Sequence, residues 1–262
     1  MIDIGLNLTH DSFAGDRDAL LESAVHAGVR HMIVTGSTLA SSQAAIDLVR
    51  EYPSLLRATA GVHPHHAGEF DERQMPALRN LLQQPDIVAS GECGLDYFRN
   101  YSSHAHQERA FRLQLQLASE IGKPLFLHQR DAHDAFLGIL RDYWPSIGRG
   151  VAHCFTGTRD EAKSYLDLGL HVGVTGWICD ERRGTHLREV VRYVPRDRLL
   201  VETDAPYLLP RDLHPKPASR RNEPKYLPHI VATIARCRAE SPEDVAAFTT
   251  ANCTALFGWP TQ

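Results

Sequence analysis

The stretch DIVASGECGLDYFRNYSSHAHQERAFRLQLQLASEIGKPLFLH (residues 86–128) contains the unit from which the fold is built. It opens and closes on short apolar runs, DIVASGE (86–92) and PLFLH (124–128), which are typical of buried strands. Between them, HQERAFRLQLQLASEIG (106–122) places apolar residues at the three-to-four spacing of one helix face. A strand, a helix and a strand in this order predict a right-handed βαβ unit with parallel strands.

The same alternation continues along the chain in both directions. Eight runs are candidate strands: MIDIGL (1–6), RHMIVTG (30–36), LLRATAGVH (55–63), DIVASGE (86–92), PLFLH (124–128), RGVAHCF (149–155), LHVGVTG (170–176) and RLLVET (198–203). Eight such units predict an α/β protein with a single (β/α)8 TIM barrel, and one domain over residues 1–262. A doubly wound open sheet is the alternative, which is disfavoured because no G-x-G-x-x-G follows the first run.

Helix ends carry signals of their own. Thr158 and Glu161 have the spacing of a capping box at the start of RDEAKSYLDLG (159–169). Gly28, Gly122 and Gly169 fall where helix C-caps are expected.

The composition is that of a globular protein. Hydrophobic residues make up 43% of the 262 and charged residues 23%, which excludes a disordered or fibrous chain. The net charge of -4 excludes a protein that coats nucleic acid through a basic surface. An anionic substrate would therefore have to bind at a local group of positive charges. No apolar run approaches the ~18 residues of a membrane span, and no Lys or Arg precedes Arg17. We expect a cytoplasmic protein with no membrane partner, and a monomer is favoured.

The five cysteines are widely spaced and include no C-x-x-C pair. This pattern indicates neither a disulfide framework nor a thiolate zinc site. We therefore expect free thiols that are buried or partly buried.

Polar residues gather at the ends of the predicted strands. His63, Glu92, His128 and His153 lie at or near the ends of four runs, and Asp204 follows the last run. In a barrel the carboxyl ends of parallel strands meet on one rim, where barrel enzymes build their active sites. Each histidine taken singly has a structural explanation, and a salt bridge could balance Glu92, but neither explains the whole set.

A set of carboxylates and imidazoles can hold Zn²⁺, Mn²⁺, Fe²⁺ or, with fewer histidines engaged, Mg²⁺. Such an ion promotes hydrolysis because it lowers the pKa of a bound water and polarises a phosphoryl or carbonyl oxygen. Asp204 is then expected to orient that water or to take its proton. The remaining histidines are given no role.

Basic residues concentrate in APYLLPRDLHPKPASRRNEPK (205–225), a proline-rich segment too long for an ordinary loop. From residue 211 to residue 225 it carries five Lys or Arg against two acids. We expect Arg220 or Arg221 to clamp a substrate phosphate. Arg130, two residues after His128, is a second candidate.

With these residues in hand, the chain resembles the TatD family of metal-dependent deoxyribonucleases. The resemblance is carried by GLNLT (5–9), AGVHPH (60–65), GECGLD (91–96), HQRDAH (128–133), HCFTGT (153–158), TGWICDERRG (175–184), ETDAPYLLPRDL (202–213) and SRRNEP (219–224). It implies a TIM-barrel hydrolase of the metal-dependent type that requires Mg²⁺ and removes nucleotides from single-stranded DNA, and perhaps RNA, in the 3′ to 5′ direction, with a role in DNA repair.

The family's residue roles carry over position by position. Its metal ligands match Glu92, His128 and His153, with Asp204 as the acid beside the metal and His63 near the substrate phosphate. Many members open with D-x-H-x-H, whereas this chain has Gly5 and Asn7 in place of the two histidines. The departure favours one well-held ion over two.

Two other functions are compatible with a barrel of this kind. An amidohydrolase or phosphotriesterase of the same barrel class usually has the H-x-H pair and often a bridging lysine on the fourth strand, where this chain has Gly5, Asn7 and Glu92. A barrel that has lost catalysis and serves as a binding scaffold would be expected to have lost polar residues at the carboxyl ends of its strands. In this chain Glu92, His128, His153 and Asp204 are all present.

Overall fold

The computed structural model describes residues 1–259. All eight predicted strands are present, and they form one parallel sheet in which the strand order follows the chain from β1 to β8. The strands are β1 (Ile2–Leu6), β2 (His31–Val34), β3 (Leu56–Ala60), β4 (Ile87–Asp96), β5 (Leu125–Arg130), β6 (Gly150–Ala152), β7 (His171–Val174) and β8 (Leu199–Val201). Eight parallel strands in chain order, alternating with helices, confirm the predicted (β/α)8 class.

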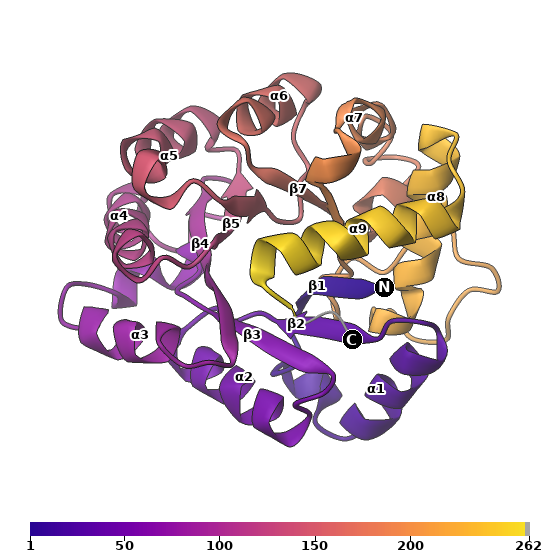
Figure 1. Ribbon diagram of the computed structural model, residues 1–262, viewed down its shortest axis with the longest axis horizontal. Helices are drawn as coiled ribbons and strands as arrows, with labels where there is room; N and C mark the ends of the chain where they lie inside the picture. Colours follow the sequence, from indigo (N-terminus) through magenta and orange to yellow (C-terminus); the bar gives the residue numbers. More distant parts are fainter. Residues whose placement is uncertain (260–262) are drawn as a thin grey trace. The chain divides into compact units, whose positions relative to one another are not determined.

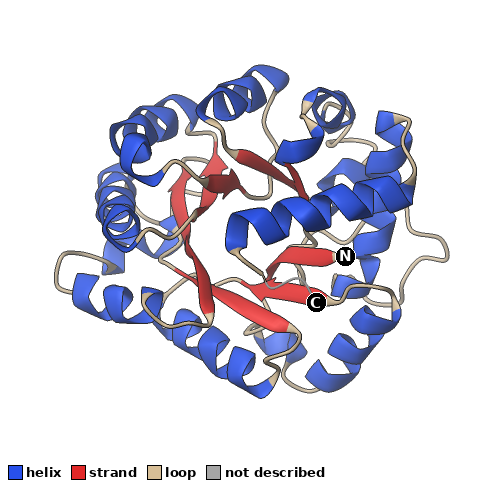
Figure 2. Ribbon diagram, in the orientation of Figure 1, coloured by secondary structure: helices blue, strands red, loops and turns tan. Residues whose placement is uncertain are grey.

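Helices follow the strands along the chain (Figure 2). The α-helices are α1 (Arg17–His26), α2 (Leu39–Glu51), α3 (Met75–Leu82), α4 (His104–Ile121), α5 (His133–Ile147), α6 (Arg159–Leu168), α7 (Leu187–Tyr193), α8 (Leu227–Arg238) and α9 (Pro242–Phe257). Short 3-10 helices are η1 (Asp11–Phe13), η2 (Pro64–Glu69), η3 (Gly176–Cys179), η4 (Arg196–Arg198) and η5 (Pro224–Tyr226). No helix within residues 1–259 is both long enough and apolar enough to cross a membrane.

The chain groups into two compact units. Among the described residues, one unit contains residues 35–153 and 167–170, and the other contains residues 1–34, 154–166 and 171–259. The single domain over residues 1–262 stays a prediction, and its last three residues lie outside the described part.

In the unit of residues 35–153, β4 pairs with β3 on one side and with β5 on the other. The helices that follow these strands pack against them, and α4 contacts β4, η2, α3 and α5. Buried aliphatic and aromatic residues fill the contacts, among them Leu115, Phe111 and Phe136. This packing fixes β4, the strand that carries Glu92.

In the other unit, β1 pairs with β2 and β7 pairs with β8. Helix α9 contacts β1 and β8, and it lies beside β1 in Figure 1. The proline-rich segment leaves β8, runs without regular structure to η5, and leads into α8.

The predicted helix-end signals are confirmed. The Thr158 N–H donates to Glu161 Oε2 at 2.6 Å and the Glu161 N–H donates to Thr158 Oγ1 at 3.3 Å, which is a capping box. Gly122 and Gly169 take left-handed φ values of 75° and 90° directly after α4 and α6, and Gly28 follows the C-cap of α1 with φ 88°. All five cysteines are free thiols, as predicted.

Candidate metal centre

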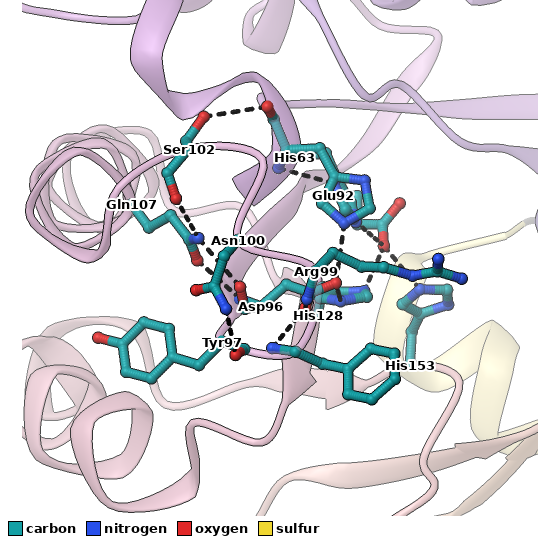
Figure 3. Close-up of polar contacts among 12 residues, drawn as sticks. His63, Glu92, Asp96, Tyr97, Arg99, Asn100, Ser102, Gln107, His128 and His153 are labelled. Atoms are coloured by element: carbon teal, nitrogen blue, oxygen red, sulfur yellow. Dashed lines mark hydrogen bonds and ion pairs between the residues drawn. The ribbon is translucent and has the colours of Figure 1, made fainter.

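Glu92 lies at the centre of a buried cluster of histidines (Figure 3). Its Oε1 atom is 2.8 Å from His153 Nε2, 3.0 Å from His128 Nδ1 and 3.4 Å from His63 Nε2. The Glu92 side chain is only 8% exposed, so water cannot balance its charge. The structure thus brings together the four residues that the sequence placed at successive strand ends.

Two of these residues sit differently from the sequence prediction. Strand β3 ends at Ala60, so His63 follows the strand and caps η2, where its Nδ1 accepts from the His65 N–H. Strand β4 does not end at Glu92 but continues to Asp96. Gly91 and Gly94, the glycines on either side of Glu92, both lie within this continuous strand.

Glycine is required in β4 because the backbone of β5 approaches closely. Gly94 pairs with His128 in the sheet and has φ 144°, and a Cβ there would lie 1.9 Å from the His128 carbonyl oxygen. At Gly91, with φ 142°, a Cβ would lie 2.1 Å from the Phe126 carbonyl oxygen. Only residues without a side chain fit this backbone, so the two glycines hold Glu92 against β5.

A second carboxylate, Asp96, extends the cluster. Its Oδ2 atom is 2.8 Å from His65 Nε2 and 3.5 Å from His128 Nε2. The backbone N–H groups of Phe98 and Arg99 donate to Oδ1 at 3.0 and 2.8 Å. His128 therefore lies between two acids, Glu92 and Asp96.

Helix α4 fixes the backbone on both sides of the cluster through two buried glutamines. Gln107 Oε1 accepts from the Asp96 N–H at 2.8 Å, and its Nε2 donates to the Asp96 carbonyl at 3.0 Å (Figure 3). Gln114 binds both backbone groups of Val62, the residue before His63, at 2.7 and 2.9 Å. Both amides are fully buried, and each one gives a hydrogen-bond partner to a buried backbone N–H and a buried backbone carbonyl.

The electrostatics of the cluster favour ionised carboxylates. Burial alone would raise the pKa of Glu92, but electrostatic attraction to the imidazoles of His63 and His153 and hydrogen bonds from His128 and His153 hold it well below the usual range. Burial likewise opposes the low pKa of Asp96, which hydrogen bonds from His128 and His65 produce.

The pKa values of His63 and His128 are shifted in opposite directions. Burial lowers the pKa of His63 well below its ordinary value, so this imidazole is neutral at pH 7. Burial also acts to lower the pKa of His128, but its hydrogen bonds to Asp96 and Glu92 outweigh it and raise the pKa. The two acids thus attract a positive charge to the position between them.

These donors fit a divalent cation. One ligand atom from each of His63, Glu92 and His128 can be chosen so that all three lie within 4.8 Å of one another. His128 Nε2 is buried and lies 3.5 Å from Asp96 Oδ2, a distance at the outer limit of a hydrogen bond. Imidazole nitrogens and a carboxylate are ligands that Zn²⁺, Mn²⁺ and Fe²⁺ accept, and oxygen-rich variants of such sites accept Mg²⁺.

Asp204 and Asn7 belong to the other compact unit. Asp204 follows β8 with a left-handed φ of 55°, a conformation that Asp tolerates better than most residues. Asn7 Nδ2 donates to Asp204 Oδ1 at 2.9 Å, and the Asp204 N–H donates to the Gly5 carbonyl. The two positions at which the sequence departs from D-x-H-x-H therefore both hold Asp204.

Two of the three arginines predicted to bind phosphate contact other side chains in the structure. Arg130 ends β5 and stacks its guanidinium 4.0 Å from the centre of the Phe98 ring. Arg221 donates to both carboxylate oxygens of Asp16, at 2.9 and 2.6 Å, and to Glu223 at 3.1 Å. Arg220 is exposed.

Sequence reasoning missed His65 and gave Asp96 no role. Both lie inside motifs that were already in view, VHPH (62–65) and GECGLD (91–96). A strand continued through Gly94 would have placed Asp96 on the face of Glu92, because alternate strand residues share a face.

Comparison with known proteins agrees with the geometry. The family model described as "TatD related DNase" matches residues 2–258. The chain belongs to this family. A curated relative from Salmonella typhimurium, named 3′-5′ ssDNA/RNA exonuclease TatD, is 51% identical over 257 residues, which cover 98% of each chain.

Solved structures support the family and the fold. A TatD homologue from Escherichia coli has a TM-score of 0.91 at 29% identity and covers 99% of this chain and 98% of its own. An uncharacterised amidohydrolase from Saccharomyces cerevisiae has a TM-score of 0.84 at 26% identity, with 98% of this chain and 99% of its own covered. This TatD-family chain thus has the fold of a metal-dependent hydrolase family and a candidate group of metal ligands.

Proposed function

We propose that this TatD-family chain is a metal-dependent exonuclease that removes nucleotides from the 3′ ends of single-stranded DNA and RNA. The observation that carries the proposal is the buried Glu92 carboxylate facing three imidazoles, in a chain that is similar over nearly its whole length to a named 3′-5′ exonuclease. The ion is proposed to be Mg²⁺, with Mn²⁺ or Zn²⁺ as substitutes. The role in DNA repair and the cytoplasmic location stay predictions.

Each residue has a proposed part in the reaction. Glu92, His128 and His153 would hold the ion, which supplies Lewis acidity and a more acidic water when bound. Asp204 takes the proton of the attacking water, and Asn7 orients the Asp204 carboxylate for this task through its 2.9 Å hydrogen bond. His63, which is neutral at pH 7, donates a hydrogen bond to the substrate phosphate.

Exposed aromatic rings beside the cluster suit a single strand. Phe98 and Tyr101 follow β4 and are 51% and 67% exposed. The Tyr101 ring lies 4.7 Å from that of His65, and Arg130 covers one side of Phe98. Aromatic faces stack on unpaired bases of any sequence, each worth roughly 1–3 kcal/mol. This explains how an acidic chain can bind nucleic acid without a basic surface.

The test uses the purified chain with DNA and RNA oligonucleotides labelled at one end. With Mg²⁺ and a 5′ label, we expect a ladder that shortens step by step, and with a 3′ label the immediate release of labelled mononucleotide. Glu92→Gln should abolish both products, whereas Glu72→Gln, at an exposed carboxylate, should not.

Three results would contradict the proposal. They are digestion that persists in excess chelator, full activity of Glu92→Gln, and an intact strand with Mg²⁺, Mn²⁺ and Zn²⁺ alike. Turnover of small amides with an intact strand would favour the amidohydrolase alternative instead.

A further inference from the structure

A second cluster of metal-binding side chains lies in the unit that does not contain Glu92. Ligand atoms of Cys179, Asp212 and His229 all lie within 4.8 Å of one another. His229 Nε2 is 2.7 Å from Asp212 Oδ1. Cys179 is fully buried, whereas the side chains of His229 and Asp212 are 27% and 24% exposed, so a small ion has a route from solvent.

The three ligands come from three different elements. Cys179 ends η3, which follows β7; Asp212 lies in the irregular segment after β8; and His229 is in the first turn of α8. No pair is close in sequence, which is why the cysteine spacing gave no hint of a thiolate site. The fold alone assembles the cluster.

The Thr233 hydroxyl accepts a hydrogen bond from the Cys179 thiol. Cys179 Sγ lies 3.5 Å from Thr233 Oγ1, which also donates to the His229 carbonyl one helical turn earlier and accepts from Arg236. If the sulfur loses its proton, the same hydroxyl can turn and donate to the thiolate. Hydrogen bonds of this kind fix the ligands of protein metal sites.

We infer that Cys179, Asp212 and His229 form a second metal site, for a zinc-like divalent ion. A thiolate, an imidazole and a carboxylate suit Zn²⁺ and Co²⁺, whereas Mg²⁺ prefers oxygen ligands alone. Three protein ligands and one water complete a tetrahedral shell. Binding displaces the thiol proton of Cys179 to solvent, and the bound ion ties the proline-rich segment 205–225 to η3 and α8.

Cobalt provides a direct readout that does not depend on nuclease activity. The chain is stripped of metal, kept reduced and titrated with Co²⁺, while the near-ultraviolet charge-transfer band of a cobalt–thiolate bond is recorded. We expect the band to saturate by two equivalents, because the Glu92 centre also takes up cobalt, and we expect Zn²⁺ to remove it. Cys179→Ser should lose the band, and Cys237→Ser, a control thiol in α8 outside the cluster, should keep it.

Two further variants test the other ligands with the thiol intact. His229→Gln and Asp212→Asn should each weaken cobalt binding by about tenfold or more. Absence of the band in the wild-type chain, or its persistence in Cys179→Ser, overturns the inference. If Cys179→Ser does not fold, His229→Gln decides: unchanged cobalt affinity would mean that the cluster is only a hydrogen-bond network.

Discussion

At the scale of single residues, the sequence predicted the position of the charged cluster but not all of its members. Glu92, His128 and His153 were identified because each follows an apolar run, and the structure places all three in contact. His65 and Asp96 were not, because their role depends on β4 continuing past Gly94. Close approach of two backbones leaves no trace in the sequence except the glycine itself.

Asp204 is the residue proposed to take the proton of the attacking water. Asp204→Asn keeps the shape of the side chain and an oxygen that can accept from Asn7, but it removes the group that takes a proton. The exonuclease rate should fall by about two or more orders of magnitude, the range of general acid–base catalysis. Asp197→Asn, at a side chain that is 70% exposed, is the matched control.

Single-turnover rates and thermal melting curves are measured for both variants. Near-normal turnover of Asp204→Asn with an unchanged melting temperature would remove Asp204 from the chemistry. A large fall in melting temperature would assign it a structural role instead.

At the scale of elements, helix α4 holds the histidine cluster in place. Gln107 and Gln114 lie on its buried face. Gln107 binds the backbone of Asp96, and Gln114 binds the backbone of Val62, the residue before His63. The helix itself was predicted from its apolar spacing, but these two glutamines were not singled out. A buried amide in a helix looks like any other polar residue until its partners are known.

Gln114→Met tests this role of α4. Methionine has a similar volume but leaves the N–H and the carbonyl of Val62 buried without partners, at a cost of about 1–3 kcal/mol for each group. We expect the free energy of unfolding to fall by about 2–4 kcal/mol, with a higher KM caused by displacement of His63. Gln116→Met, at an exposed position of the same helix, should change neither quantity.

Urea unfolding and steady-state kinetics give both quantities. Equal stabilities of the two variants would show that water replaces the Gln114 amide at the Val62 backbone.

The irregular segment 205–225 is tied to η1 and to the start of α1 by Arg221, which binds Asp16 and the Ser12 carbonyl. To bind a substrate phosphate as predicted, Arg221 would have to release the Asp16 carboxylate. Arg221→Ala should then raise KM and reduce the slope of log affinity against log salt by about 0.7.

Asp16→Asn supplies the complementary variant, because it weakens the hold on Arg221 without removing the guanidinium. Binding of a non-cleavable oligonucleotide at several salt concentrations measures the slope for each variant. If Arg221→Ala lowers the melting temperature and leaves the slope unchanged, the arginine only anchors the segment.

At the scale of the whole molecule, the strand count and order were predictable, because each strand is a short apolar run bounded by turn residues. The grouping of the chain into two compact units was not, since it depends on packing rather than on any local pattern. Nor was the cluster of Cys179, Asp212 and His229, whose members meet only in the folded chain. Distances along the sequence carry little information about such sites.

The stability of the whole fold should depend on pH through Asp3, a fully buried acid in β1. Asp3 accepts hydrogen bonds from the Thr203 N–H, the Thr203 hydroxyl and the Gly5 N–H, at 2.9, 2.5 and 3.2 Å. Burial nevertheless raises its pKa from 3.8 to about 7. Between these values the folded chain keeps a proton that the unfolded chain gives up, so the stabilisation is complete below pH 3.8 and is lost as the pH rises through about 7.

Asp3→Asn isolates this contribution. The amide oxygen can still accept from the two N–H groups, and the amide nitrogen can donate to the Thr203 hydroxyl, but nothing titrates. We expect the free energy of unfolding of the wild-type chain to fall by up to about 4 kcal/mol relative to Asp3→Asn between pH 4 and pH 8, since one pKa unit corresponds to about 1.4 kcal/mol.

Urea unfolding across this range measures the difference between the two chains, in which the contributions of other titrating groups cancel. Asp11→Asn, at an exposed acid, should follow the wild-type curve. Parallel curves for wild type and Asp3→Asn would mean that the three hydrogen bonds outweigh burial and keep Asp3 ionised in the folded chain.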